Sequence, residues 1–292
     1  LRLDWGIEGY YSSLLNGVDG RQYGYYNEDS DGEQNIVEPV DGKNVVSTID
    51  INIQQIIRTA IENYNGRMAG GPNGEDSAEN VGVIVMDPDT GEILGMDSSD
   101  WYDLNNPRDL TAFYTEEEIA AMDNETMLDN LNSIWRNFCI SDTYEPGSTF
   151  KPLTVAAALE SGSISQNDSF YCEGYYTVSG QMIRCAVYPG AHYELSVAQA
   201  LAQSCNACLM QIGEQIGISD FVRYQKIFNF GSKTGIDLPG ESSGVLFTED
   251  EMGPVELATS TFGQGFNCTM IQEAAAFCSL INGGYYYTPH VV

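Results

Sequence analysis

Basic residues are scarce in this sequence. Twelve Lys and Arg stand against forty-two Asp and Glu among 292 residues, and the formal net charge is −30 at pH 7. Nucleic acids and anionic membrane surfaces are recognised by basic patches, so this charge balance argues against both kinds of partner. Its acidic residues are dispersed along the chain, as solubility in an exposed, salty setting requires.

Three further features are lacking. The chain has no run of about eighteen consecutive apolar residues, the length that a membrane-spanning helix needs, and we expect no membrane span. It begins at Leu1 with neither an initiator methionine nor a signal peptide, so we expect it to be a piece of a longer protein. Its two histidines, His192 and His290, lie far apart and suggest no ligand cluster.

The cysteine pattern predicts neither a disulfide framework nor a metal site. Seven cysteines are an odd number for a set of disulfides. Cys172 and Cys185 flank a predicted hairpin, and they either pair in an oxidising compartment or stay two buried thiols. Cys205 and Cys208 form a C-x-x-C with no second pair at zinc spacing, and we interpret them as helix packing. No metal or cofactor is expected.

The first 44 residues show little periodicity beyond a short helix around residues 5–15. Within them, residues 27–38 have the oxygen spacing of an EF-hand calcium loop. Pro39 follows directly and prevents an exit helix, so a polar hairpin turn is the preferred interpretation.

From residue 45 the hydrophobic pattern predicts a sheet with helices packed on it. Residues 45–49 predict a strand, and Asp50 is expected to cap a helix with apolar residues at helical spacing. Residues 81–98 predict a hairpin around a turn at residues 87–91. Residues 101–143 predict an acidic, mostly helical insert. The order of strand, helix and hairpin is typical of an α+β fold with an antiparallel sheet.

Ser148 and Lys151 are the main candidates for chemistry. Their S-x-x-K spacing at a helix start puts both side chains on one face, about one turn apart. A serine hydroxyl needs a base to remove its proton, and a neutral lysine amine is such a base. Among the four lysines only Lys151 follows a serine at this spacing. By itself the pattern is weak, since a serine at a helix start is more often an N-cap.

Several motifs in a fixed order make the indication much stronger. They are YEPGSTFKP at residues 144–152, QSCN at 203–206, FGSKTGIDLPGE at 230–241, FGQG at 262–265 and INGGYYYTPHVV at 281–292. This order resembles the transpeptidase domain of class B penicillin-binding proteins, the enzymes that cross-link bacterial peptidoglycan. The resemblance covers residues 45–292, and residues 1–44 resemble the end of the family's N-terminal pedestal domain. It implies an antiparallel sheet covered by helices, with a helical lobe.

The resemblance also implies a role for each site residue. Ser148 is expected to attack a D-Ala-D-Ala stem peptide and form an acyl-enzyme, while Lys151 accepts its proton through an amine of lowered pKa. Ser204, at a predicted turn between two helices, would relay a proton to the leaving D-alanine. Asn206 would hold Lys151 and the substrate amide. β-Lactams mimic the stem peptide and are expected to trap Ser148.

The family's third motif, K-T-G, has a decoy in this chain. Lys233, Thr234 and Gly235 spell it, but in a segment that precedes the catalytic strand in the family. We therefore interpret this K-T-G as structural. The transpeptidase domain is then expected to be truncated before the strand that binds the substrate carboxylate and supplies half of the oxyanion hole. Without that strand the chain alone can be inactive.

The implied protein is a serine-type D,D-transpeptidase on the extracytoplasmic face of a bacterial membrane, anchored by an N-terminal segment outside this chain. Its expected partners are peptidoglycan stem peptides, β-lactams and a glycosyltransferase of the cell-wall machinery. A β-lactam sensor domain, a β-lactamase of the same fold and a non-catalytic penicillin-binding scaffold stay open as alternatives. The pedestal-like residues 1–44 favour the enzyme over the sensor, slow deacylation would exclude the β-lactamase, and the intact S-x-x-K and S-x-N motifs argue against the scaffold.

Overall fold

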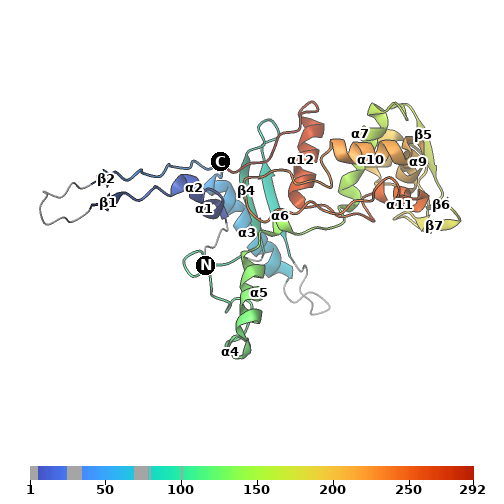
Figure 1. The fold of residues 1–292 in the computed structure, drawn as a ribbon. Coiled ribbons are helices and arrows are strands. Elements are labelled where there is room, and N and C mark those ends of the chain that lie inside the picture. Colours follow the sequence, from blue (N-terminus) through green and yellow to red (C-terminus); the bar gives the residue numbers. More distant parts are fainter. Residues whose placement is uncertain (1–5, 25–34, 69–77, 79, 100) are drawn as a thin grey trace, which may run out of the picture.

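The computed structural model describes residues 6–24, 35–68, 78, 80–99 and 101–292. The molecule is elongated, with a thin hairpin at one end, a helix-covered sheet in the centre and a helical lobe at the other end (Figure 1). Among the described residues, none of the helices combines the length and the apolar character needed to cross a membrane. Helices alternate with antiparallel strand pairs, which confirms the predicted α+β class.

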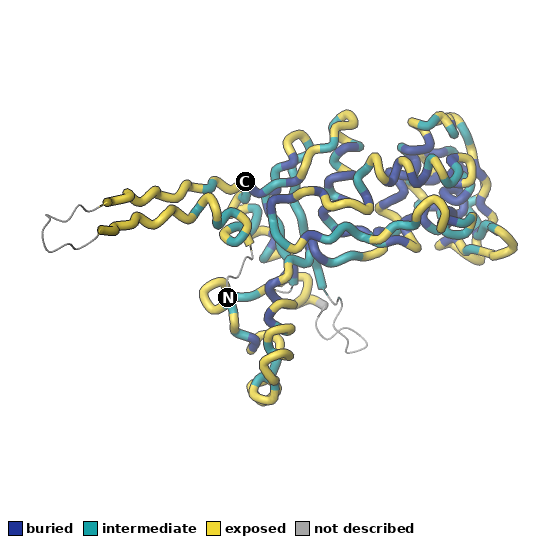
Figure 2. Tube along the Cα trace, viewed as in Figure 1, coloured by how far each residue is buried: buried dark blue, intermediate teal, exposed yellow. Residues whose placement is uncertain are grey.

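The N-terminal segment forms the thin end of the molecule. The predicted short helix is two helices, α1 (Gly6–Tyr10) and α2 (Ser12–Leu15), and they lead into an antiparallel pair of strands, β1 (Arg21–Tyr23) and β2 (Asn35–Val37). Both strands are exposed along their length (Figure 2). The two strands pair antiparallel on either side of the motif that resembles an EF-hand loop, and residues 27–34 of that motif lie outside the described residues.

The central sheet contains the predicted hairpin, β3 (Gly82–Met86) and β4 (Ile93–Ser98), which pair antiparallel. The C-terminal segment lies beside β4, where Ile93 donates its N–H to the His290 carbonyl at 2.9 Å. The strand predicted at residues 45–49 is wrong, because that segment has no regular strand partner. Single hydrogen bonds hold its end in place, among them one from the Thr48 N–H to the Val291 carbonyl and one from the Thr48 hydroxyl to the Ile93 carbonyl.

Helix α3 (Ile51–Met68) packs on β4 and covers one face of this sheet. It begins where the sequence predicts, because an Asp50 carboxylate oxygen accepts the backbone N–H of Asn52 at 2.7 Å. Its buried side is formed by Ile57 and Ile61, which are 4% and 2% exposed. The predicted helix and its cap are confirmed.

The acidic insert that follows is helical, as predicted. It contains α4 (Glu116–Ala121), α5 (Asn124–Trp135) and α6 (Phe138–Ser141). A small separate core holds it together, built from Leu110, Leu131, Ile134 and Trp135. In Figure 1 α4 and α5 project from the body of the molecule.

The helical lobe contains the largest core among the described residues, and Figure 2 shows buried segments in its interior and exposed ones at its surface. Its elements are η1 (Gly147–Phe150), α7 (Lys151–Glu160), α8 (Val197–Ala202), α9 (Asn206–Ile216), α10 (Ile218–Ile227) and α11 (Pro254–Ser260). Helix α12 (Met270–Ile281) joins the lobe to the sheet by packing on both α7 and β3. Phe150 is at the lobe's centre, with edge-to-face contacts to Phe230 and Phe266.

Four short strands at the tip of the lobe cover α9. Strand β5 (Ser169–Cys172) pairs with β8 (Tyr193–Ser196), and β6 (Tyr175–Val178) pairs with β7 (Gln181–Arg184) in the predicted hairpin. Both pairs are antiparallel and contact α9 or its neighbour α8. The cysteines and the histidine of this region therefore come close to the N-terminus of α9.

Candidate active site

Ser148 lies in a tight turn that leads directly into a buried helix. It belongs to the 3₁₀ turn η1, which continues without a break into α7, and its side chain is exposed. Gly147 before it has a φ of +64°, a conformation that glycine adopts without steric cost. Lys151, one turn later, is only 2% exposed. An accessible hydroxyl thus lies over a buried amine.

The Ser148 turn rests on the backbone of the FGQG motif. Gly147 donates its N–H to the Gly263 carbonyl at 2.9 Å. A Cβ added to Gly263 would lie 2.1 Å from the Gly147 carbonyl oxygen, much closer than two such atoms can approach. Gly263 also has a φ of +81°. Only glycine allows this close approach, which explains why FGQG contributes to the site without a reactive side chain.

The structure brings all four predicted site residues together. The Lys151 ammonium donates to the Ser204 carbonyl at 2.7 Å, to Ser204 Oγ at 2.8 Å and to Asn206 Oδ1 at 2.6 Å. Ser204 Oγ in turn donates to Ser148 Oγ at 3.1 Å. A continuous hydrogen-bond path therefore runs from the buried lysine through Ser204 to the exposed Ser148.

The turn between α8 and α9 positions the second pair of residues. Ser204 has a φ of +49°, in the left-handed region where a non-glycine residue is strained. This conformation directs both its carbonyl and its hydroxyl toward Lys151. Cys205 is buried directly behind it, and Asn206 begins α9. The predicted turn is confirmed, but the strain at Ser204 could not be read from the sequence.

Burial favours the neutral form of the Lys151 amine, which is the form that proton transfer needs. Loss of solvent lowers the pKa of its amine below the ordinary lysine value, because burial disfavours the charged form. The thiols of Cys185 and Cys205 act in the opposite direction. A lowered pKa increases the fraction of neutral amine near pH 7, and neutral amine is the form that accepts a proton.

The K-T-G decoy has a structural role. Lys233, Thr234 and Gly235 lie in an irregular segment after α10, not on a strand. Both the backbone N–H and the hydroxyl of Thr234 donate to the carboxylate of Glu241, at 2.5 and 2.6 Å, and Gly235 donates to its second oxygen. The hydrogen bonds of Thr234 and Gly235 to Glu241 therefore close this loop, and these groups already have partners within the protein.

The expectation that His192 belongs to no ligand cluster is wrong, because the structure gathers it with Cys172, Cys185 and Cys205. The four ligand atoms lie within 4.8 Å of one another. Each comes from a different loop or element, so no short motif predicts the group. Cys205 and Cys208 are also buried in the core of the lobe, which agrees with their predicted role in helix packing.

Comparison with known proteins gives a consistent result. The family described as Penicillin binding protein transpeptidase domain matches residues 81–292. Stage V sporulation protein D of Bacillus subtilis is 35% identical over 98% of this chain and 41% of its own length. Peptidoglycan D,D-transpeptidase MrdA of Escherichia coli is 27% identical over 98% of this chain and 44% of its own length. This chain spans about four tenths of these curated relatives.

Solved structures show the same architecture. A peptidoglycan synthetase from Bifidobacterium adolescentis matches with a TM-score of 0.80 at 25% identity, over 99% of this chain and 48% of that chain. Penicillin binding protein 3 from Mycobacterium tuberculosis, complexed with aztreonam, matches with a TM-score of 0.75 at 23% identity, over 99% and 55% of the two chains. At 23% identity, the match to the Mycobacterium tuberculosis protein shows a shared fold alone.

Proposed function

This chain belongs to the penicillin-binding protein transpeptidase family, and we propose that it carries the acylation site of an enzyme that cross-links peptidoglycan stem peptides. The observation that supports this most is the path from buried Lys151 through Ser204 to exposed Ser148. It joins a base, a relay and a nucleophile in the order that acyl transfer needs. This chain spans about four tenths of the length of its curated relatives. The proposal therefore covers only the part of the activity that this domain carries out.

Acylation uses these residues as follows. Ser148 Oγ attacks the carbonyl carbon of the penultimate D-alanine, and its proton passes through Ser204 Oγ to the neutral amine of Lys151. The oxyanion forms near the backbone N–H groups at the start of η1 and α7, where the helix dipole stabilises negative charge. The peptide C–N bond breaks, the proton returns through Ser204 to the leaving amine of D-alanine, and the stem is left as an ester on Ser148.

Deacylation repeats the same path with a different amine. An amino group of a second stem peptide loses its proton to the Ser204–Lys151 pair and attacks the ester carbonyl. A new amide bond forms and Ser148 regains its proton. Asn206 accepts a hydrogen bond from Lys151 throughout and keeps the amine directed at Ser204. A β-lactam forms the same ester, but its tethered leaving group stays in the site and obstructs the acceptor.

The domain proposal follows from the same motifs. We assign residues 45–292 to the transpeptidase domain and residues 1–44 to the end of a pedestal domain. Because Thr234 is bound to Glu241, the chain's K-T-G is not the carboxylate-binding strand, and we propose that this strand comes from sequence after residue 292. A membrane anchor, an extracytoplasmic location and a glycosyltransferase partner are proposed for the complete protein on the family resemblance alone.

The decisive assay is exchange of the terminal D-alanine. The protein is incubated with a D-Ala-D-Ala stem peptide and an isotopically labelled D-amino acid, and products are separated by mass. A transpeptidase forms the exchange product. Acylation by benzylpenicillin without exchange supports a sensor, rapid hydrolysis of benzylpenicillin supports a β-lactamase, and no reaction with either compound supports a scaffold. Each of these three results would overturn the proposal, provided that a chain extended through the third motif gives the same result.

Gly263→Ala is expected to lower the rate of acylation about a hundredfold, because moving a catalytic group by about 1 Å can cost that much. The new Cβ would collide with the Gly147 carbonyl and displace the Ser148 turn. The rate is measured with a fluorescent penicillin. Gly162→Ala is the matched control, since Gly162 has a φ of +72° but nothing within 4 Å of an added Cβ. If Gly162→Ala slowed acylation as much as Gly263→Ala, the loss would come from placing alanine at a positive φ and not from displacement of the Ser148 turn.

Asn206→Asp is expected to move the pH dependence of acylation to higher pH. A carboxylate beside the Lys151 amine stabilises its charged form and raises its pKa. Since the neutral amine is the base, the rate rises with pH through this pKa, and each unit of increase lowers the rate near pH 7 about tenfold. Acylation rates measured between acidic and alkaline pH test this. Exposed Asn167→Asp is the control, and an unmoved profile in Asn206→Asp would contradict the role of Lys151.

A further inference from the structure

Exposed tyrosines are concentrated at the tip of the helical lobe. Residues 171–193 make up less than a tenth of the chain but contain five of its 18 tyrosines. The exposed fractions of Tyr193, Tyr171 and Tyr188 are 64%, 51% and 40%. Single exposed aromatic residues are common on protein surfaces, whereas a group of them marks a binding surface.

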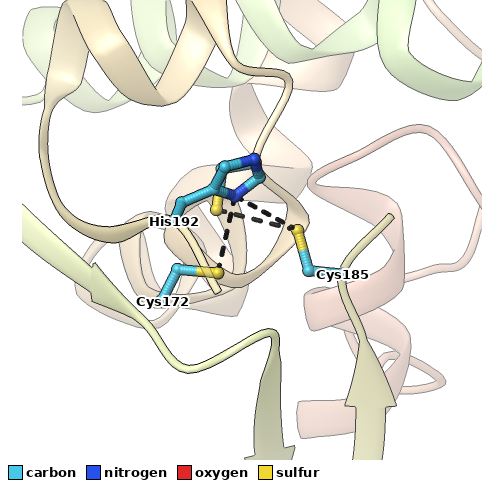
Figure 3. Close-up of side chains that lie close together, drawn as sticks. Cys172, Cys185 and His192 are labelled. Carbon is cyan, nitrogen blue, oxygen red and sulfur yellow. Dashed lines mark hydrogen bonds between the residues drawn. The ribbon is translucent and has the colours of Figure 1, made fainter. Parts of the chain in front are cut away.

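The short strands that carry these tyrosines have an inner and an outer side. Strands β5, β6 and β7 all contact α9, so their inner sides face this helix. Cys172, Cys185 and His192 lie together on the inner side (Figure 3). Successive residues of a strand point to opposite sides, and Phe170 and Cys172 are both buried. Tyr171 between them therefore lies on the outer side.

Strand β6 is arranged in the same way. The Tyr176 hydroxyl donates to the Glu214 carboxylate of α9 at 2.5 Å, so Tyr176 is an inner residue. Its neighbour Tyr175 lies on the outer side and pairs with Arg184 of β7 in the antiparallel register. The outer sides of both strand pairs are thus turned away from α9, on one surface of the lobe.

The outer tyrosines form two ring pairs. The ring centroids of Tyr171 and Tyr193 are 6.3 Å apart, and those of Tyr175 and Tyr188 are 6.5 Å apart, both edge to face. The Arg184 guanidinium lies 4.8 Å from the centre of the Tyr188 ring, where the attraction of a cation to an aromatic face holds the ring in place. We call Tyr171, Tyr175, Tyr188 and Tyr193 the outer tyrosine surface.

A close backbone contact joins the two ring pairs. Gly174 lies between β5 and β6, and a Cβ added to it would be 2.0 Å from the Gly190 carbonyl oxygen and 3.7 Å from the Tyr188 ring. Residues 188–190 are thus packed against the turn that connects Tyr171 to Tyr175. The two ring pairs therefore lie next to each other as parts of one surface.

The polar groups of this surface are open to a ligand. Among the described residues, the structure gives no hydrogen-bond partner to the hydroxyls of the four outer tyrosines, whereas that of Tyr176 is bound to Glu214. Glu194 lies opposite Tyr171 in the strand register, and one of its carboxylate oxygens accepts the Ser169 hydroxyl at 2.9 Å. The surface therefore offers aromatic faces bordered by hydrogen-bond donors and acceptors.

Aromatic faces with polar borders are suited to a sugar chain. One face of a hexopyranose ring presents mostly C–H groups, which pack on an aromatic ring, while its hydroxyl and amide groups lie at the edge. Tyrosine hydroxyls and carboxylates form hydrogen bonds with those edge groups. A polyanionic chain such as a nucleic acid is repelled by the net charge of −30, whereas an uncharged glycan is not.

We propose that the outer tyrosine surface binds a glycan strand of β-linked N-acetylhexosamines. The choice of this glycan rests on the proposed function, because the stem peptides that react at Ser148 are carried on such a strand. The tyrosine rings stack on the C–H faces of successive sugars. The Glu194 carboxylate accepts a hydrogen bond from an acetamido N–H.

One helix connects the outer tyrosine surface to the active site. Gln211 of α9 donates its side-chain amide to the Tyr171 carbonyl at 2.7 Å. Asn206, which binds Lys151, begins the same helix. A glycan bound to β5 is therefore held at a fixed position relative to Ser148, which raises the effective concentration of its stem peptides at that residue.

Binding is tested with glycan strands from which the stem peptides have been removed. Their affinity for the chain is measured by isothermal titration calorimetry, with chitohexaose as a second, defined ligand. We expect Tyr193→Ala and Tyr171→Ala each to weaken binding about tenfold, as truncation of a central aromatic residue does at other interfaces. Tyr193→Phe keeps the ring and should bind like the wild type. Tyr285→Ala is the matched control, since Tyr285 is 66% exposed and lies outside this surface.

Three results of this titration would overturn the proposal. They are no binding of either glycan by the wild type, equal affinity of the wild type and both alanine variants, and displacement of the glycan by a free stem peptide, which would indicate a peptide site. Saturation-transfer NMR on the wild type gives a test that needs no variant. Sugar C–H protons should receive magnetisation from aromatic protons, and transfer from methyl protons alone would also overturn the proposal.

These measurements involve no acylation, so they separate the glycan site from the proposed function. Glycan binding in a protein that benzylpenicillin does not label would contradict the transpeptidase assignment and support the glycan site. Labelling at Ser148 in a protein that binds neither glycan would overturn the glycan site and leave the assignment of the nucleophile in place.

Discussion

Ser148→Ala is expected to abolish covalent labelling by benzylpenicillin. Alanine has no oxygen to form the ester, and the other hydroxyl on the path, that of Ser204, is held between Lys151 and Ser148. The Ser148 side chain is exposed, so its removal leaves the core around Phe150 unchanged and the variant should fold. Intact-mass spectrometry after incubation should show one adduct on the wild type and none on the variant.

The control for this experiment is Ser165→Ala, which removes another exposed serine in the same lobe. It should be labelled at the wild-type rate. An adduct of equal yield on Ser148→Ala would mean that a different nucleophile reacts, and the assignment of the site would be wrong.

Lys151→Met is expected to reduce the acylation rate by a factor of about 10²–10⁴, the usual contribution of a general base. Methionine fills most of the buried lysine's volume but cannot accept the proton of Ser148. Lys151→Arg should be equally slow, because arginine keeps the positive charge and the donors but stays protonated at all accessible pH values. The rates are measured as adduct mass against time, with exposed Lys226→Met as the control.

The pH dependence separates a base from a merely positive group. With burial lowering the pKa of Lys151, the wild-type rate should fall as pH decreases through that lowered pKa and the amine becomes charged. Lys151→Met should lose this limb of the profile. If Lys151→Arg instead keeps wild-type activity, the lysine acts through its charge and the relay through Ser204 is contradicted.

Local patterns predicted much of the scaffold. The cap at Asp50, the apolar spacing of α3 and the hairpin of β3 and β4 each depend on neighbours within one or two turns, and all three are found. The strand at residues 45–49 depended on propensity alone and is wrong, because no neighbouring strand pairs with that segment. Strand formation depends on a partner that the segment itself does not contain.

The candidate site was predictable only as separate motifs. S-x-x-K and S-x-N named the four residues, but their hydrogen bonds link segments more than fifty positions apart and had to be seen in the structure. The thiol and imidazole group was missed for the same reason. Its members are spread over Cys172 to Cys205 without a short ligand motif, and the pairing of β5 with β8 and of β6 with β7 folds them together. The one sign of this group in the sequence was that His192 lies between Cys185 and Cys205.

The most direct test of the account is to locate the acyl group. Benzylpenicillin-treated protein is digested and the modified peptide is sequenced by tandem mass spectrometry. We expect the added mass on Ser148, within residues 144–152, at a stoichiometry that matches the intact protein. An adduct on any other residue, in protein whose residues 144–152 are recovered unmodified, would contradict the proposal that Ser148 is the nucleophile served by Ser204 and Lys151.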